Sequence, residues 1–99
     1  MATIYTIPQL QQLLTPILAE NGVKKAVLFG SYGKGAATEK SDVDLLVDSD
    51  LRGLRFVELL EQVQRLLGKE VDLFDIRHIE AGSLIDQEIQ ATGVTVYEE

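Results

Sequence analysis

The sequence alternates between segments with the apolar spacing of helices and short apolar runs typical of strands. Residues 7–21 and 54–67 each carry apolar side chains at the i, i+3, i+4, i+7 spacing of one helix face. The first stripe consists of Leu10, Leu13, Leu14, Ile17 and Leu18, and the second of Phe56, Leu59, Leu60, Val63, Leu66 and Leu67. Gly22 and Gly68 end these helices. Pro16 predicts a kink in the first helix, or a restart with Thr15 as its N-cap.

Three short apolar runs predict strands over residues 24–29, 42–48 and 70–76. Ser83 and Asp86 have capping-box spacing and predict a short helix, after which Thr92-Gly93 leads into an edge strand over residues 94–97. The predicted fold class is α+β, a small mixed β-sheet with helices packed on it. Because a chain of 99 residues supports one core, we expect a single domain over residues 1–99.

Composition limits the chemistry of any site. The absence of cysteine and the presence of one histidine, His78, exclude disulfides and argue against thiolate or imidazole metal clusters. Any metal must be held by oxygen, which favours Mg²⁺ or Mn²⁺. A net charge of −7 without a basic patch argues against direct nucleic-acid binding, although a single nucleotide carried with its metal is compatible. The sequence has no leader-like start and no membrane-length apolar run, so we expect a cytoplasmic protein without membrane contact.

Two carboxylates stand one residue apart at the start of the predicted strand 42–48. Residues i and i+2 of a strand point to the same face, so Asp42 and Asp44 are expected to project together. Asp72 lies on the next predicted strand, and if the two strands are neighbours, three carboxylates converge. Such a cluster resists ionisation unless a cation neutralises it. The pattern therefore predicts a divalent metal site, and two ions in it would suit displacement at phosphorus.

A glycine-rich turn precedes these carboxylates. Gly30 ends the first predicted strand, and Ser31 can begin a short helix whose free N–H groups suit a phosphate. Lys34 in the same turn can meet a phosphate as a point charge, or be a plain solvated loop residue. Tyr32 is expected to pack beside the loop.

Each of these residues also has an explanation that involves no function. Asp42 and Asp44 can be solvated acids at a strand entry, and Asp72 a charge on an edge strand. Asp75 alternates with the apolar residues of its strand, which ranks it below Asp72. His78 is interpreted as a surface or turn residue.

Gly30-Ser31, ten further residues and Asp42-Val43-Asp44 resemble the signature of the polymerase-β-like nucleotidyltransferase superfamily. The short chain and "SDVDLLV" resemble its minimal nucleotidyltransferase (MNT) group, which includes antitoxins encoded beside HEPN-domain toxins. The resemblance implies that Asp42, Asp44 and Asp72 bind two Mg²⁺ ions and catalyse transfer, and that Gly30 and Ser31 hold the phosphates of ATP. It further implies transfer of AMP to a hydroxyl, a tyrosine, of a partner HEPN toxin.

This chain departs from the family at Gly33-Lys34-Gly35, where many relatives have Ala-Arg-Gly. A lysine lacks bidentate phosphate contact, and Gly33 is expected to loosen the turn. Three alternatives remain. The chain can modify a small molecule, as aminoglycoside nucleotidyltransferases do, or neutralise a toxin by occlusion without catalysis. Template-independent RNA extension fits its acidity poorly.

Overall fold

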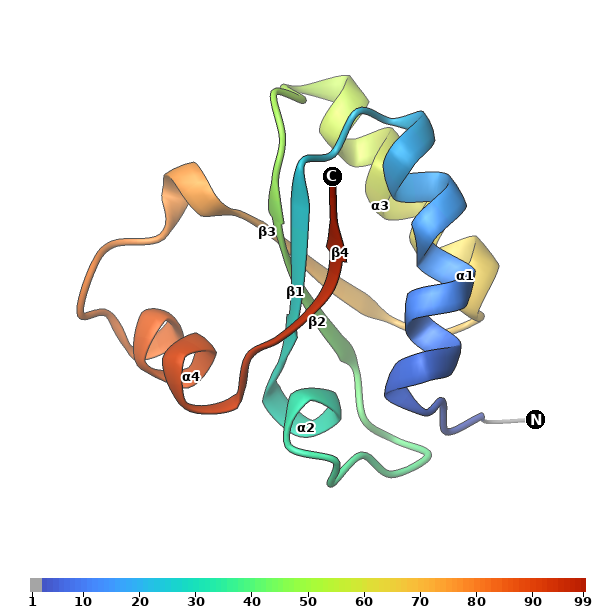
Figure 1. The fold of residues 1–99 in the computed structure, drawn as a ribbon, viewed down its shortest axis with the longest axis vertical. Coiled ribbons are helices and arrows are strands. Elements are labelled where there is room, and N and C mark those ends of the chain that lie inside the picture. Colours follow the sequence, from blue (N-terminus) through green and yellow to red (C-terminus); the bar gives the residue numbers. More distant parts are fainter. Residues whose placement is uncertain (1–2) are drawn as a thin grey trace.

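The computed structural model describes residues 3–99, and a four-stranded mixed sheet forms its centre (Figure 1). The strands are β1 (Lys25–Phe29), β2 (Val43–Asp48), β3 (Val71–Asp75) and β4 (Val94–Glu98). Their order across the sheet is β3-β2-β1-β4. β1 pairs with β2 and β4 in antiparallel fashion, whereas β2 and β3 are parallel. The predicted mixed sheet and its edge strand β4 are confirmed.

Two long helices cover one face of this sheet (Figure 1). They are α1 (Ile7–Glu20) and α3 (Leu54–Leu67), and their apolar stripes pack on the alternate residues of β1 and β2. Side chains of both helices are completely buried in this core, among them Leu10, Leu14, Leu18, Leu59 and Val63. Leu66 is an exception: it is 38% exposed although its spacing predicts burial. Within residues 3–99, no helix has the length and apolar character needed to cross a membrane.

The first helix is continuous through its internal proline. Thr6 is the N-cap: its hydroxyl accepts from the Gln9 N–H at 3.2 Å, and the Gln9 side chain accepts from the Thr6 N–H at 2.8 Å. Pro16 lies inside the helix, so the predicted restart with Thr15 as N-cap is wrong. The hydroxyl of Thr15 instead donates to the carbonyl of Gln11. Burial of the leucines on both sides of Pro16 compensates the one backbone hydrogen bond that proline removes.

The remaining elements are α2 (Gly30–Gly33), the 3₁₀ turn η1 (Ile76–His78) and α4 (Leu84–Thr92). α4 lies on the side of the sheet away from α1 and α3 (Figure 1). Its predicted cap is confirmed, because the Ser83 hydroxyl accepts from the Asp86 N–H at 3.2 Å. The Asp86 side chain accepts from the Gly82 N–H at 2.9 Å, one residue before the position that a reciprocal capping box uses.

Candidate active site

The pairing of β2 with β3 brings two of the predicted site residues together. Asp44 and Asp72 are direct partners in the parallel register. In the antiparallel pairing of β1 with β2, Phe29 is the partner of Asp44. The turn that begins at Gly30 therefore starts beside the same carboxylates. The expectation that the strands of Asp44 and Asp72 are neighbours is confirmed.

Asp42 occupies a different setting from Asp44. β2 begins at Val43, so Asp42 lies immediately before the strand and is exposed, whereas Asp44 is half-buried. Asp72 is exposed on β3. The negative charge of Asp42 nevertheless contributes to raising the pKa of Asp44, so the two carboxylates act on the same region.

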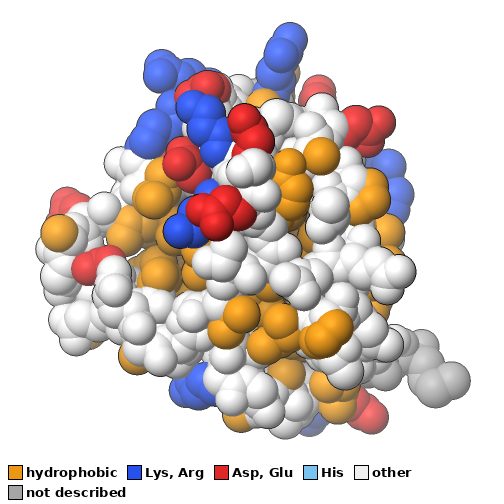
Figure 2. Space-filling view, in the orientation of Figure 1, with side chains coloured by type: hydrophobic (Ala, Val, Ile, Leu, Met, Phe, Trp, Pro, Cys, Tyr) orange, Lys and Arg blue, Asp and Glu red, His pale blue; other side chains and the backbone are white. Residues whose placement is uncertain are grey.

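The walls around Asp44 are partly aromatic. The rings of Phe29 and Phe74 approach across β2 with centroids 5.6 Å apart and a tilt of 50°. Hydrophobic side chains are visible on the side of the sheet toward α4 in the space-filling view (Figure 2). Phe29 is buried and is the register neighbour of Asp44, so this carboxylate enters an environment that favours its neutral form.

The electrostatics of Asp44 follow from this position. Its pKa is raised to about 6, first by burial and then by the negative charges of Asp72 and Glu88. A hydrogen bond with the Asp72 side chain and the charge of Asp42 contribute further. Among residues 3–99, the ion pairs join Lys24 to Asp50 and Arg77 to Asp75. Neither pair neutralises the carboxylates around Asp44, which leaves a concentrated negative charge.

The chemistry of this donor set fits a hard divalent cation. Asp42, Asp44 and Asp72 offer carboxylate oxygens, which are the ligands that Mg²⁺ and Mn²⁺ prefer, and their mutual repulsion would be relieved by positive charge. In the described part of the chain, no three acidic or histidine side chains already form an arrangement that could hold a metal. The residues thus fit a metal by type and charge, while their present positions are not those of a coordination sphere.

The predicted phosphate loop forms the short helix α2. Gly30 adopts a left-handed φ of +71°, and a Cβ atom there would collide with Oδ2 of Asp44. Gly33 is confined as well, because its Cβ would collide with the carbonyl oxygen of Thr92. The expectation that Gly33 loosens the turn is therefore wrong. Ser31 is half-buried in the loop and Lys34 is exposed at its end.

α4 contributes a residue that sequence reasoning missed. Oε1 of Glu88 lies 3.3 Å from the position that a Cβ of Gly30 would take, and the Glu88 charge acts on Asp44. The Gly30 N–H donates to the hydroxyl of Thr92 at 2.9 Å. The C-terminal end of α4 is therefore attached to the start of the loop. No local signal in residues 84–92 indicates this contact, because it depends on how α4 packs against α2.

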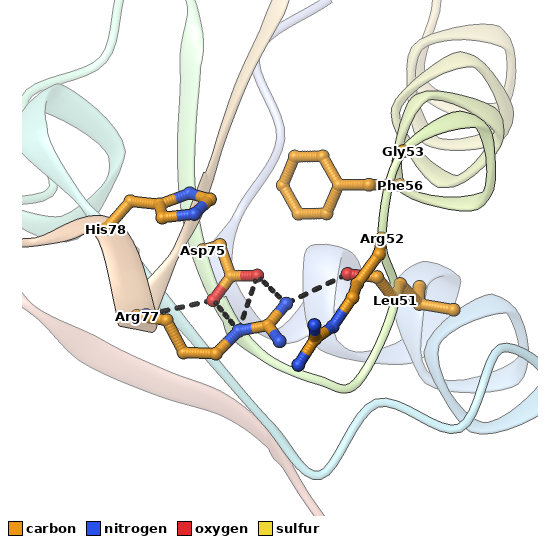
Figure 3. A pocket seen from close by; sticks show the side chains of 7 residues that line it. All are labelled: Leu51, Arg52, Gly53, Phe56, Asp75, Arg77 and His78. Carbon is orange, nitrogen blue, oxygen red and sulfur yellow. Dashed lines mark hydrogen bonds and ion pairs between the residues drawn. The ribbon is translucent and has the colours of Figure 1, made fainter.

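Asp75 and His78 do not join this group of carboxylates; both line a separate hollow (Figure 3). Asp75 is buried and accepts from Nε of Arg77 at 3.0 Å, and Nη2 of Arg77 also donates to the carbonyl of Leu51 at 2.9 Å. These hydrogen bonds from Arg77 lower the pKa of Asp75. The ion pair borders a hollow of about 600 Å³ lined by Leu51, Arg52, Gly53, Phe56, Asp75, Arg77 and His78. Asp75 therefore serves the structure at the far end of β3 from Asp72, in agreement with its lower rank.

Comparison with known proteins assigns the family. Residues 12–99 match the family model described as "Polymerase beta, Nucleotidyltransferase". The chain belongs to this nucleotidyltransferase family. The protein adenylyltransferase MntA of Thermococcus cleftensis is 42% identical over 74 residues, which are 69% of this chain and 75% of that protein. The resemblance inferred from Gly30-Ser31 and the two aspartates is confirmed.

Solved structures share the fold of this nucleotidyltransferase. A crystal structure of a toxin-antitoxin with AMP-PNP has a TM-score of 0.76 and 25% identity, and the match covers 90% of this chain and 73% of that chain. A tri-AMPylated Shewanella oneidensis HEPN toxin in complex with MNT antitoxin gives a TM-score of 0.72 at 21% identity. That match covers 95% of this chain and 74% of the other, and at this identity it shows the fold alone.

Proposed function

We propose that this nucleotidyltransferase transfers AMP from metal-bound ATP to a tyrosine hydroxyl of a HEPN toxin, and so acts as the antitoxin of a toxin-antitoxin pair. The observation that carries the proposal is the pairing of Asp44 with Asp72 beside the Gly30 turn, which brings carboxylates and a glycine-containing turn together. The relative MntA is a protein adenylyltransferase, and solved neighbours include a complex with AMP-PNP and one with an AMPylated HEPN toxin.

In this proposal each residue has a distinct task. Asp42, Asp44 and Asp72 would hold two Mg²⁺ ions, which neutralise negative charge on the triphosphate and on the attacking oxygen. Ser31 and Lys34 bind the β- and γ-phosphates, and Asp72 favours loss of the proton from the acceptor hydroxyl. The acceptor oxygen forms a bond to the α-phosphorus as the bond from that phosphorus to the bridging oxygen breaks. AMP remains on the acceptor, and pyrophosphate leaves with the displaced electron pair.

The test is transfer of label from ATP carrying a labelled α-phosphate to the protein encoded by the neighbouring gene, the proposed HEPN partner. We expect labelling of the partner by the unmodified protein and none by the double variant Asp42→Asn/Asp44→Asn. The matched control is Asp48→Asn/Asp50→Asn, which has the same spacing and charge change at the other end of β2. Chelation separates the mechanisms, since occlusion survives it and transfer does not. Unlabelled partner, together with equal toxin inhibition by the Asp42/Asp44 variant, would sink the catalytic proposal.

A further inference from the structure

Glu88 holds a carboxylate over the turn that the proposed function assigns to phosphate. Its Oε1 lies 3.3 Å from the point where a Cβ of Gly30 would project, and Oδ2 of Asp44 is closer still to the same point. The two carboxylates therefore both lie close to Gly30, at the start of α2. The three aspartates come from β2, its entry and β3, whereas Glu88 comes from the separate helix α4.

Two contacts, both made by Thr92, hold α4 against the turn at Gly30–Gly33. The Thr92 hydroxyl accepts from the Gly30 N–H at 2.9 Å and donates to the carbonyl of Glu88 at 2.7 Å. The backbone of Gly33 packs directly against the carbonyl of Thr92, which leaves no room for a side chain. Because one hydroxyl joins Gly30 to the backbone of Glu88, that backbone is held beside the turn, and the Glu88 carboxylate lies close to Gly30.

We propose that Glu88 makes nucleotide binding depend on a divalent metal, by repelling a triphosphate that arrives without one. The inference rests on the proposed function, since it concerns the same nucleotide. A metal-free triphosphate at the Gly30 turn would bring several negative charges close to the Glu88 carboxylate. Coulomb repulsion between these charges opposes binding. Metal ions held by the aspartates would offset the phosphate charge and remove this penalty.

Glu88 can be separated experimentally from the three aspartates. Loss of Asp42, Asp44 or Asp72 removes a proposed metal ligand, and so weakens binding of the metal-bound nucleotide. Glu88→Gln keeps those ligands and the size of the side chain but removes the charge. Glu88 is exposed, so its substitution leaves the core intact. The matched control is Glu98→Gln, the same change at the far end of β4, where Glu98 is the register partner of Lys25.

The experiment is calorimetric titration of ATP into the unmodified chain, Glu88→Gln and Glu98→Gln, each with Mg²⁺ and with EDTA at low ionic strength. We expect Glu88→Gln to tighten metal-free binding about three- to tenfold and to leave binding with Mg²⁺ nearly unchanged. The gain should shrink at about 0.5 M salt because screening weakens charge repulsion. A gain caused by extra space would not respond to salt. Glu98→Gln is expected to resemble the unmodified chain.

The outcomes distinguish this inference from the proposed function. If the unmodified chain binds ATP with Mg²⁺ and Glu88→Gln leaves metal-free affinity unchanged or weaker, the role of Glu88 is overturned alone. If Glu88→Gln instead weakens binding with Mg²⁺, the residue is a metal ligand and the repulsion proposal fails. If the unmodified chain does not bind ATP even with Mg²⁺, both the proposed function and this inference are contradicted.

Discussion

Asp44 lies directly beside Asp72 across the parallel pair β2–β3, and the Asp44 carboxylate faces the turn at Gly30. Two like charges at adjacent positions of a sheet oppose folding, and the pKa of Asp44 is raised first by burial and then by the charge of Asp72. The sheet retains this arrangement although neither carboxylate has a basic partner among the described ion pairs. Such a local conflict is typical of a site kept for function rather than for stability.

Asp72→Asn is therefore expected to stabilise the metal-free protein while abolishing transfer. Removing the neighbouring charge relieves Asp44 and should raise the free energy of unfolding at pH 8 by roughly 0.5–1 kcal/mol, the usual size of a cross-strand charge effect. Urea denaturation in EDTA measures this. Asp48→Asn removes a carboxylate at the other end of β2 and serves as the control. A destabilised Asp72→Asn protein would contradict the repulsion that we infer.

Gly30→Ala should cost more than a left-handed backbone alone explains. Gly30 and Gly35 have nearly the same φ, +71° and +73°, but within the described part of the chain a new Cβ would meet neighbouring atoms at Gly30 and none at Gly35. We expect Gly35→Ala to lose about 1 kcal/mol from the left-handed strain. Gly30→Ala should lose roughly 1–3 kcal/mol more because Asp44 must move. Urea denaturation of both variants is the measurement. Equal losses would mean that the Asp44 side chain yields without cost.

The local sequence pattern was sufficient to predict the helices and strands. The contacts between elements depend on tertiary packing, which the local pattern does not contain. The stripe at 54–67 gave the bounds of α3, since helix spacing and Gly68 are properties of the local chain. The meeting of Asp44 with Asp72 was predictable only on the condition that their strands pair. Glu88 was missed because no periodicity links α4 to the Gly30 turn. The restart at Thr15 failed for a related reason: packing of α1 on the sheet outweighs the local effect of Pro16.

Asp75→Asn should reveal a pH-dependent contribution to stability. Hydrogen bonds from Arg77 hold the pKa of the buried Asp75 below the ordinary value of 3.8. A lowered folded pKa means that the stabilisation is complete above 3.8 and disappears as the pH falls through the folded value. At pH 7 we expect the variant to lose about 1.5–3 kcal/mol, the cost of hydrogen bonds to a charged group. The difference from the unmodified protein should then narrow below pH 3.8.

Urea denaturation at pH 7 and pH 3 measures this effect. The control is Asp50→Asn, which breaks the exposed pair with Lys24 at 3.5 Å. That change should alter stability by no more than about 0.5 kcal/mol at either pH. A deficit of Asp75→Asn that stays constant from pH 7 to pH 3 would show that the ion pair with Arg77 is not its source.

Two tyrosines, one buried and one half-buried, offer a test of hydroxyl groups with and without a hydrogen-bond partner. Tyr32 is 2% exposed and its hydroxyl has no hydrogen-bond partner among residues 3–99, whereas the Tyr5 hydroxyl donates to the carbonyl of Leu67. Removal of an unpartnered buried hydroxyl relieves a desolvation cost, so Tyr32→Phe should leave stability unchanged or raise it by up to about 1 kcal/mol. Tyr5→Phe should lose about 0.5–1.5 kcal/mol with its hydrogen bond. Thermal and urea unfolding of the two variants compare them directly. Destabilisation of Tyr32→Phe as large as that of Tyr5→Phe would mean that the Tyr32 hydroxyl has a bound partner in solution, such as an ordered water.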